Sequence, residues 1–182
     1  FSILLLGGIS ILAQFSSSGG EFDYLSKSHA LRFSVFFFFF LAVSFTQIRF
    51  WSDYSLLIFI FLILLLVVVK FYGIQSQGSK RWINLFIFNL QPSELMKVGI
   101  ILILSNHYHK VSSSDINKLK YLFFPMLILV VPFMLVLTQP DLGTAILILL
   151  SGIVVIWLAG VQWKIFAYLS GLAVIMAPVT IS

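Results

Sequence analysis

The sequence predicts an all-α, polytopic helical membrane protein. Of its 182 residues, 60% are hydrophobic and only 9% are charged, whereas a soluble domain carries about 25% charged residues. The apolar residues form long runs between short polar segments. This pattern favours helical spans over a barrel, whose strands would alternate residue by residue. We therefore expect residues 1–182 to form a single integral membrane domain.

The apolar runs divide into about seven transmembrane segments when a full span is taken as about 20 residues. The first and last are expected to be incomplete, because both ends of the chain are apolar. The expected segments are residues 1–15, 29–47, 54–72, 94–105, 121–137, 142–159 and a last one beginning at Ile165. The fourth segment reaches a full span only if it starts near Pro92 and extends to Tyr108.

Polar segments between these spans predict the connections. Residues 16–21 form a turn cluster rich in Ser and Gly, and residues 49–53 are expected to form a short turn. The segment 73–93 contains its own apolar piece, residues 82–90, which favours an interfacial or a re-entrant helix. The loop 106–120 is the most polar, and its residues 112–115 are expected to cap a short amphipathic helix.

Two features inside the spans predict how the helices pack. Pro125 and Pro132 remove backbone hydrogen bonds, so we expect kinks whose freed groups are satisfied by neighbouring elements. Gly143, Gly152 and Gly160 are expected to allow close helix packing.

Charged residues gather in one stretch, GSKRWINLFIFNLQPSELMK, which runs from residue 78 to 97. Lys80 and Arg81 lie beside Trp82, at what we expect to be a membrane edge. Glu94 and Lys97 are three residues apart in the next span, so a helix places them on one face. An acid and a base inside a span are costly unless they face a cavity or each other. This stretch is therefore the first candidate for function.

A second stretch repeats the same order of residues. Gln139 and Pro140 precede Asp141, as Gln91 and Pro92 precede Glu94. Two spans separate the stretches, which places both on the same side of the membrane. An acid in the first turn of a helix is favoured by the unpaired N–H groups there, so capping is the preferred interpretation of Asp141.

Other site classes find little support in the residues. The chain has no cysteine, and His107 and His109 do not form a convincing ligand set, so no metal site is expected. The net charge of +5 comes from cations scattered at span ends. Such cations anchor helices, so we expect no nucleic-acid partner. Equal numbers of them fall on the two sides, and charge alone leaves the orientation undecided.

Three motifs together resemble the SEDS family of membrane proteins, which includes RodA, FtsW and SpoVE. They are GSKRWI at residues 78–83, QPSELMK at 91–97 and QPDLGT at 139–144, in order along the chain. The third motif is closer to RodA than to FtsW. The resemblance covers essentially the whole chain.

This resemblance implies a bacterial inner-membrane protein of about ten spans, of which the chain would be the N-terminal part. It implies a peptidoglycan glycosyltransferase that polymerises lipid II during cell-wall elongation, shape determination and division. It also implies a class B penicillin-binding protein and the rod-elongation complex as partners, and the catalytic Asp would follow the seventh span. On this view 73–93 is periplasmic, 106–120 is cytoplasmic, and a divalent cation (Mg²⁺ or Mn²⁺) could offset the charge of the pyrophosphate.

The resemblance assigns substrate-binding roles that compete with simpler ones. Lys80 and Arg81 would contact the pyrophosphate, or they merely anchor the interface. Glu94 and Lys97 would line the central cavity, or they only neutralise each other. Asp141 would orient a loop near the site in addition to capping. On physics alone, a flippase or transporter fits equally well, and a non-catalytic scaffold of the elongation machinery is a third alternative.

Overall fold

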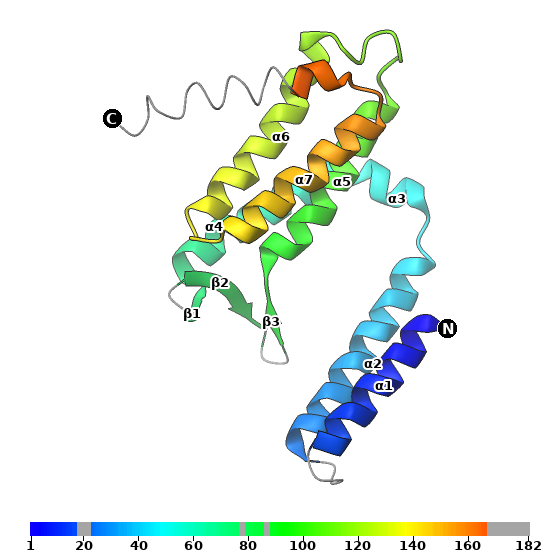
Figure 1. Ribbon diagram of the computed structural model, residues 1–182, viewed down its shortest axis with the longest axis vertical. Coiled ribbons are helices and arrows are strands. Elements are labelled where there is room, and N and C mark those ends of the chain that lie inside the picture. Colours follow the sequence, from blue (N-terminus) through cyan, green and yellow to red (C-terminus); the bar gives the residue numbers. More distant parts are fainter. Residues whose placement is uncertain (18–22, 77–78, 86–87, 167–182) are drawn as a thin grey trace. The chain divides into compact units, whose positions relative to one another are not determined.

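The structure is a computed structural model that describes residues 1–17, 23–76, 79–85 and 88–166 (Figure 1). Among these residues helices predominate, alongside one small sheet. The elements are α1 (Ser2–Ser17), α2 (Tyr24–Ser44), α3 (Ile48–Asp53), α4 (Ser55–Tyr72), β1 (Ile74–Ser76), β2 (Ser79–Asn84), β3 (Asn89–Leu90), α5 (Pro92–His109), α6 (Leu119–Leu137) and α7 (Leu142–Leu158). Most of the predicted 16–21 turn and nearly all of the predicted seventh span lie outside the described residues.

The helices confirm the prediction of a polytopic helical membrane protein. Among the described residues, three helical stretches are long and apolar enough to cross a membrane: Ser26–Ser44, Ser55–Tyr72 and Leu119–Leu137. Helices α1 and α7 are apolar but shorter. Helix α5 extends from Pro92 to His109, which confirms the longer form of the fourth predicted span.

The chain divides into two compact units, of which the first comprises Phe1–Ile48 and Leu85–Phe88. In it α1 and α2 form an antiparallel hairpin. Gly7 is the contact point, since a Cβ there would lie 2.0 Å from the ring of Phe33. One turn further, Ser10 Oγ and His29 Nε2 share a hydrogen bond of 2.8 Å. Phenylalanines in the run 36–40 are mostly exposed, as expected of a lipid-facing surface.

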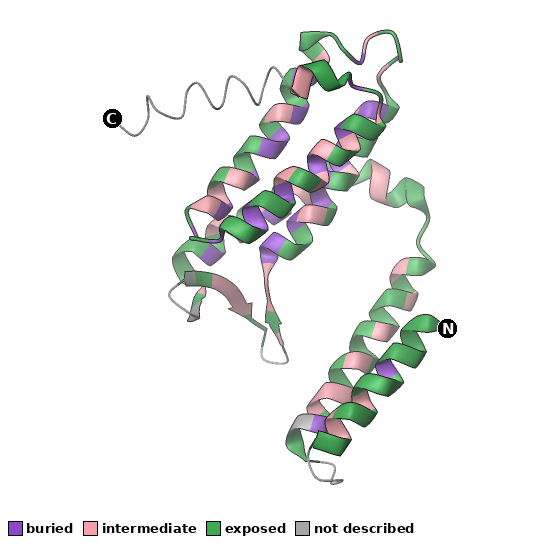
Figure 2. Ribbon diagram, in the orientation of Figure 1, coloured by how far each residue is buried: buried purple, intermediate pink, exposed green. Residues whose placement is uncertain are grey.

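The second unit comprises Arg49–Asn84 and Asn89–Ser182, and its centre is a bundle of α4, α5, α6 and α7. Helix α5 packs against α4 and α7, and α7 packs against α6. Figure 2 shows that the buried positions gather on the facing sides of these helices. The fully buried side chains of this core include Leu66, Met96, Ile100, Leu104, Val136 and Ile148.

Glycines set the helix spacing in this bundle, but only some of the predicted ones. A Cβ on Gly152 would lie 2.0 Å from Leu129 Cδ2 and 3.2 Å from Ile100 Cγ2, so α7 needs this glycine to approach α5 and α6. The same prediction is wrong for Gly143 and Gly160, which have open space where a Cβ would be. Gly160 instead has a φ of 103°, a conformation that glycine adopts without steric cost.

The predicted interfacial helix in 73–93 is wrong, because the described part of this segment forms an antiparallel sheet in the order β1-β2-β3. Ile74 pairs with Trp82, and Ile83 pairs with Leu90. Branched and aromatic residues favour strands. Pairing between strands satisfies the backbone groups that the prediction assigned to a helix.

The two polar connections at the other end of the bundle also differ from prediction. The loop predicted at 106–120 begins only at Lys110, because α5 continues to His109. In place of a capped helix from Ser112, successive turns lead to α6: Asp115 N donates to Ser112 O, and Lys118 N donates to Asp115 O, each at 2.9 Å. The turn predicted at 49–53 is the short helix α3.

A polar network explains why α3 is ordered. Asn106 Nδ2 donates to Ser52 O at 2.9 Å and to Ser55 Oγ at 2.8 Å. Ser52 Oγ returns a hydrogen bond of 3.0 Å to Asn106 Oδ1. The amide of Asn106 therefore ties α5 to the junction between α3 and α4.

Helix α6 contains both predicted prolines, and a neighbour repairs one of the gaps they create. Pro125 has no N–H to donate to Tyr121 O, the acceptor one turn earlier. His107 Nε2 lies 3.2 Å from this carbonyl oxygen and donates to it. His107, which the prediction placed in the polar loop 106–120, therefore lies on α5 and replaces a missing bond of α6.

Candidate functional site

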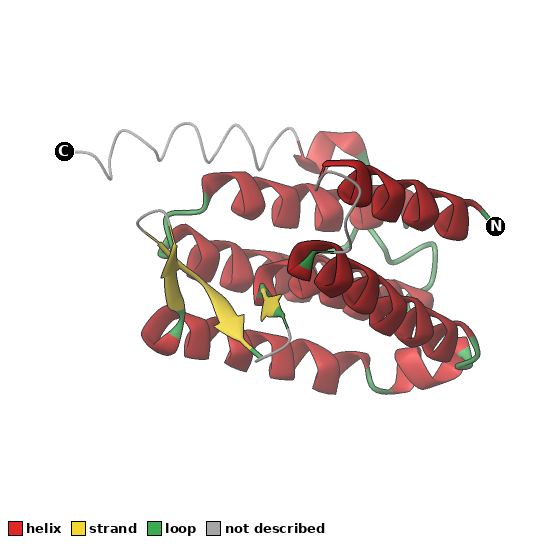
Figure 3. Cartoon of the chain, turned by 90° about the horizontal axis from the view of Figure 1, so that it is seen from below, coloured by secondary structure: helices red, strands yellow, loops and turns green. Residues whose placement is uncertain are grey.

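The candidate site lies at the end of the four-helix bundle where the sheet is found (Figure 3). Helix α4 ends there, α5 begins there, and the turn from α6 to α7 lies at the same end. Strand β2 packs against α4 and α5. The two sequence stretches that share a Gln-Pro pair therefore do come together at one end of the bundle.

The two stretches are joined by an ion pair between Arg81 and Asp141. Arg81 Nε lies 3.5 Å from Asp141 Oδ2, and the side chains are 30% and 11% exposed. Arg81 Nη2 also donates a hydrogen bond to Pro140 O. The guanidinium of β2 thus contacts both the charge and the backbone of the α6–α7 turn. Arg81 Nε itself is buried and makes no hydrogen bond with the described residues, so its contact with Asp141 is purely an ion pair.

Asp141 has two further contacts. Its Oδ1 accepts a hydrogen bond of 3.2 Å from Thr144 N, which makes it the N-cap of α7. Its Oδ2 accepts a longer bond of 3.4 Å from Gln91 Nε2. The prediction that Asp141 caps a helix is confirmed. Because the residue is only 8% exposed, Arg81 is the cation that offsets its buried charge.

Gln139 fixes the same turn to a third element. Its side chain is 4% exposed, and Nε2 donates to Leu66 O on α4 at 3.1 Å. Gln91 and Gln139 belong to the sequence motifs, but no role was predicted for either side chain. The repeated Gln before Pro was the sequence signal for such a role. Each glutamine precedes a helix, and its side-chain amide donates to a different element: Gln91 to Asp141, and Gln139 to Leu66 O.

Lys80 lies next to Arg81 on β2 but makes a different contact. Its Nζ donates to Phe71 O, one of the last carbonyl groups of α4, at 3.2 Å. A cation at the C-terminal end of a helix is favoured by the helix dipole and the unpaired carbonyls. The side chain is exposed, so its remaining donors face outward.

Glu94 and Lys97 form the predicted pair on α5. Lys97 Nζ donates to Glu94 Oε2 at 2.8 Å. The side chain of Lys97 is 24% exposed and that of Glu94 is 54% exposed. The bond uses one of the ammonium's donors. Lys97 therefore lies one turn into the helix, already neutralised by Glu94, and can still offer hydrogen bonds to an anion.

The carboxylates at this end do not form a metal site. Within the described part of the chain, no three His, Cys, Asp or Glu side chains gather closely enough to hold an ion. Asp141 and Glu94 are each paired with a cation. Among the described residues, those at this end of the bundle therefore do not by themselves fit a divalent cation.

Fold and site together define a class: a polytopic helical membrane protein with a small β-sheet at one end of its bundle. The antiparallel strands β1 and β2, called the hairpin from here on, are joined to the α6–α7 turn by the buried ion pair of Arg81 and Asp141. The chain belongs to the family of FtsW, RodA and SpoVE, described as cell cycle proteins, whose family model matches residues 1–182.

Relatives of two kinds are similar in sequence. The probable peptidoglycan glycosyltransferase FtsW of Buchnera aphidicola (subspecies Schizaphis graminum) is 33% identical over 152 residues, which are 81% of this chain and 43% of that protein. The peptidoglycan glycosyltransferase MrdB of Escherichia coli K12 is 35% identical over 126 residues, 69% of this chain and 32% of MrdB. The chain thus spans less than half the length of these relatives.

Solved structures share the fold. The rod shape determining protein RodA of Thermus thermophilus aligns with a TM-score of 0.75 at 22% identity, over 96% of this chain and 58% of that one. A chain from a peptidoglycan synthase complex, described as coordinating polymerization and crosslinking, aligns with a TM-score of 0.77 at 23% identity, over 94% of this chain and 51% of its own length.

Proposed function

We propose that this chain is part of a peptidoglycan glycosyltransferase that polymerises lipid II in the bacterial inner membrane. The observation that carries the proposal is the family match over residues 1–182, together with relatives that bear this activity in their names. On this proposal the end of the bundle with the hairpin faces the periplasm, where the glycan is made.

The hairpin end supplies cations for the charged part of such a substrate. Lipid II carries a pyrophosphate, and phosphate oxygens are strong acceptors for Lys and Arg. Lys97 is the best-placed candidate, because it is partly exposed and keeps free donors beside Glu94. Lys80 is exposed on β2 and could add a second contact.

Arg81 and Asp141 have a different role in this proposal. Arg81 already contacts Asp141 and Pro140, so we assign the pair to positioning rather than to phosphate binding. By holding β2 against the α6–α7 turn, the pair fixes the hairpin that carries Lys80. A preorganised cation stabilises developing charge without the cost of rearranging at the moment of reaction.

The general base is expected outside this chain, in the later part of the protein. That carboxylate would remove the proton of the acceptor hydroxyl, which attacks the anomeric carbon as the pyrophosphate of the donor leaves. A divalent cation stays a prediction, and no step is assigned to it. A penicillin-binding partner of class B and the rod-elongation complex are also proposed, supported by the likeness to a chain from a peptidoglycan synthase complex.

The test is reconstitution of the full-length protein with fluorescently labelled lipid II. Glycan polymers formed without another polymerase would support the proposal. The Lys97→Ala variant should lower the rate at least tenfold. Lys70→Ala removes an exposed cation from the last turn of α4, at the same end of the bundle, and should have little effect. Movement of lipid II between leaflets with no polymer would instead favour a flippase and overturn the proposal.

A further inference from the structure

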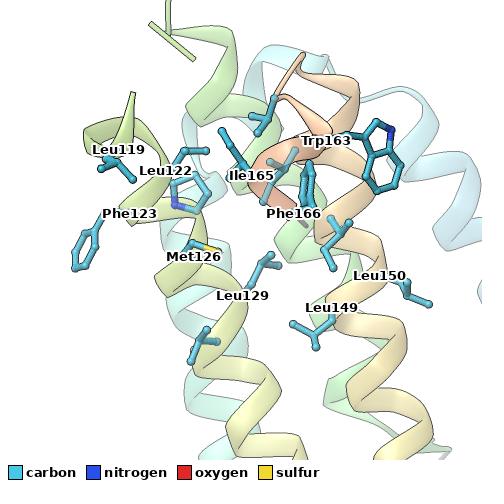
Figure 4. A pocket seen from close by; sticks show the side chains of 15 residues that line it. Leu119, Leu122, Phe123, Met126, Leu129, Leu149, Leu150, Trp163, Ile165 and Phe166 are labelled. Atoms are coloured by element: carbon cyan, nitrogen blue, oxygen red, sulfur yellow. The ribbon is translucent and has the colours of Figure 1, made fainter. Parts of the chain in front are cut away.

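An apolar cavity lies towards the other end of the bundle, between α6 and α7. It has a volume of about 890 Å³, and its wall includes Leu122, Met126 and Leu129 on α6 and Leu149, Ile153 and Ile156 on α7 (Figure 4). This volume falls within the range of roughly 300–1,000 Å³ that is usual for small-molecule sites.

The cavity is separate from the cluster around Arg81. On α6 its lining runs from Leu119, where the helix begins, to Val130, whereas the candidate site lies beyond Leu137, where α6 ends. Between Val130, the last lining residue on α6, and Leu137 the helix rises about 10 Å at 1.5 Å per residue. The cavity therefore needs an explanation that the proposed function does not give.

The wall of the cavity is suited to hydrocarbon. The lining is almost wholly apolar, and Trp163 and Phe166 contribute to it at the end where the chain leaves α7. Tryptophan is typical of the boundary between hydrocarbon and headgroups. The wall thus fits an acyl chain whose polar end lies level with Trp163.

Two lysines lie at the end of the cavity where α6 begins. Lys120 follows the cavity residue Leu119, and Lys164 lies between the cavity residues Trp163 and Ile165. Both lysines are exposed, and neither has an ion-pair partner among the described residues. The nearby carboxylate of Asp115 is already paired with Lys118 at 2.6 Å. This end of the cavity therefore carries net positive charge.

We infer that this cavity between α6 and α7 is a binding site for an anionic phospholipid of the bilayer. The acyl chains lie between α6 and α7, and the phosphate of the headgroup lies near Lys120 and Lys164. Basic pockets between transmembrane helices are a recurring way of binding such headgroups. The positive charge at this end of the cavity is what selects an anionic lipid over a zwitterionic one, whose tails would fit the same wall.

Native mass spectrometry of the full chain in detergent tests the site with two probes, phosphatidylglycerol and phosphatidylcholine of the same acyl composition. We expect at least a fivefold preference for phosphatidylglycerol. The double variant Lys120→Ala/Lys164→Ala should lose the preference, while Lys110→Ala should keep it. Lys110 has the same charge at the same end but no neighbour in the cavity wall. Equal binding of the two lipids, or an equal effect of Lys110→Ala, would overturn the inference.

A second pair of variants tests the cavity itself. Ile153→Trp fills the cavity and should reduce bound phosphatidylglycerol at least fivefold, whereas Val154→Trp, on the exposed neighbouring position outside the wall, should not. The chain has no cysteine, so Ile153→Cys can be labelled alone. We expect a lipid-soluble maleimide to react in delipidated protein and phosphatidylglycerol to protect the thiol. A thiol that never reacts would mean that polypeptide fills the cavity, which would also overturn the inference.

Discussion

Arg81 and Asp141 meet across the end of the bundle, with Nε and Oδ2 3.5 Å apart, although one lies on a strand and the other caps α7. Each side chain makes a second contact with backbone: Arg81 with Pro140 O, and Asp141 with Thr144 N. The pair therefore holds β2, in the stretch 78–97, against the α6–α7 turn and the N-terminus of α7.

Removing one partner of this pair should destabilise the protein. We expect Arg81→Gln or Asp141→Asn to cost about 1–3 kcal/mol, because each leaves a mostly buried charge without its counter-ion. The double variant should recover part of the loss. Asp141→Ala should cost more than Asp141→Asn, since Asn can still cap α7. Unfolding of the full-length protein in detergent micelles measures all four.

The matched control for that cycle is the ion pair of Arg49 and Asp53 on α3. Its atoms are 3.8 Å apart and its side chains are 86% and 65% exposed. Its coupling energy should be near zero, as it is for most exposed pairs. Equal coupling in the two cycles would show that burial of Arg81 and Asp141 contributes nothing.

Glu94 should matter for substrate through Lys97. Glu94→Gln keeps the shape of the side chain but removes the charge that holds Lys97 Nζ at 2.8 Å. We expect KM for lipid II to change while the folded fraction stays constant, because the ammonium is then free to take other positions. Steady-state kinetics of full-length protein, with circular dichroism as the folding check, measures this. If Glu94→Ala and Lys97→Ala both leave activity and folding unchanged, the pair has no part in the site.

Gly152 should tolerate no side chain. Gly152→Ala would bring Cβ against Leu129 and Ile100, and overpacking of this kind costs about 1–3 kcal/mol. Gly143→Ala, in the first turn of the same helix with open space around it, should be neutral or slightly stabilising. Thermal melting of the two variants side by side decides whether close packing, rather than helix propensity, requires Gly152.

Asn106 should contribute more than its position on an apolar helix implies. Asn106→Ala removes three hydrogen bonds to Ser52 and Ser55. Hydrogen bonds between membrane helices are worth about 0.6 kcal/mol each, so we expect a loss of about 2 kcal/mol. Ser105→Ala, at the exposed neighbouring position, is the control. Equal stability of the two variants would contradict a structural role for the network.

The pair of Asp115 and Lys118 predicts a pH window. The hydrogen bond from Lys118 lowers the pKa of Asp115 from its usual value of 3.8, and the same bond raises the pKa of Lys118 from 10.5. The contribution of Asp115 to stability is complete above its unfolded pKa and disappears as pH falls through the lowered folded pKa. That of Lys118 is complete below its unfolded pKa and disappears as pH rises through the raised one. NMR titration of Asp115 should show a lowered midpoint that returns towards normal in Lys118→Ala.

The spans were predictable because hydropathy follows the membrane directly. Helices α4, α6 and α7 lie within two residues of the predicted limits, since long apolar runs have one stable arrangement in lipid. The pair of Glu94 and Lys97 was also predictable, because helical spacing alone brings the two residues together.

The hairpin and the tertiary contacts were not predictable in this way. The apolar content of residues 82–90 fits a strand as well as an interfacial helix, and only pairing with Ile74 separates the two. Likewise, the sequence placed Arg81 and Asp141 on one side without indicating that they touch. The contact of His107 was not predictable, because its partner is Tyr121 O, which lacks a helical donor since Pro125 has no N–H. The two groups come together only when α5 and α6 pack.

The bond from Gln139 to Leu66 O has a consequence for biogenesis. The two residues are 73 positions apart in the chain, and the polypeptide enters the membrane from its N-terminus. When α4 and the hairpin have been synthesised, neither Gln139 nor Asp141 has yet left the ribosome. Arg81 therefore has no Asp141 to pair with until α6 has been inserted into the membrane. The junction is thus a late step of insertion. We expect nascent chains halted before Gln139 to leave the hairpin open to protease, and chains extended past α7 to protect it.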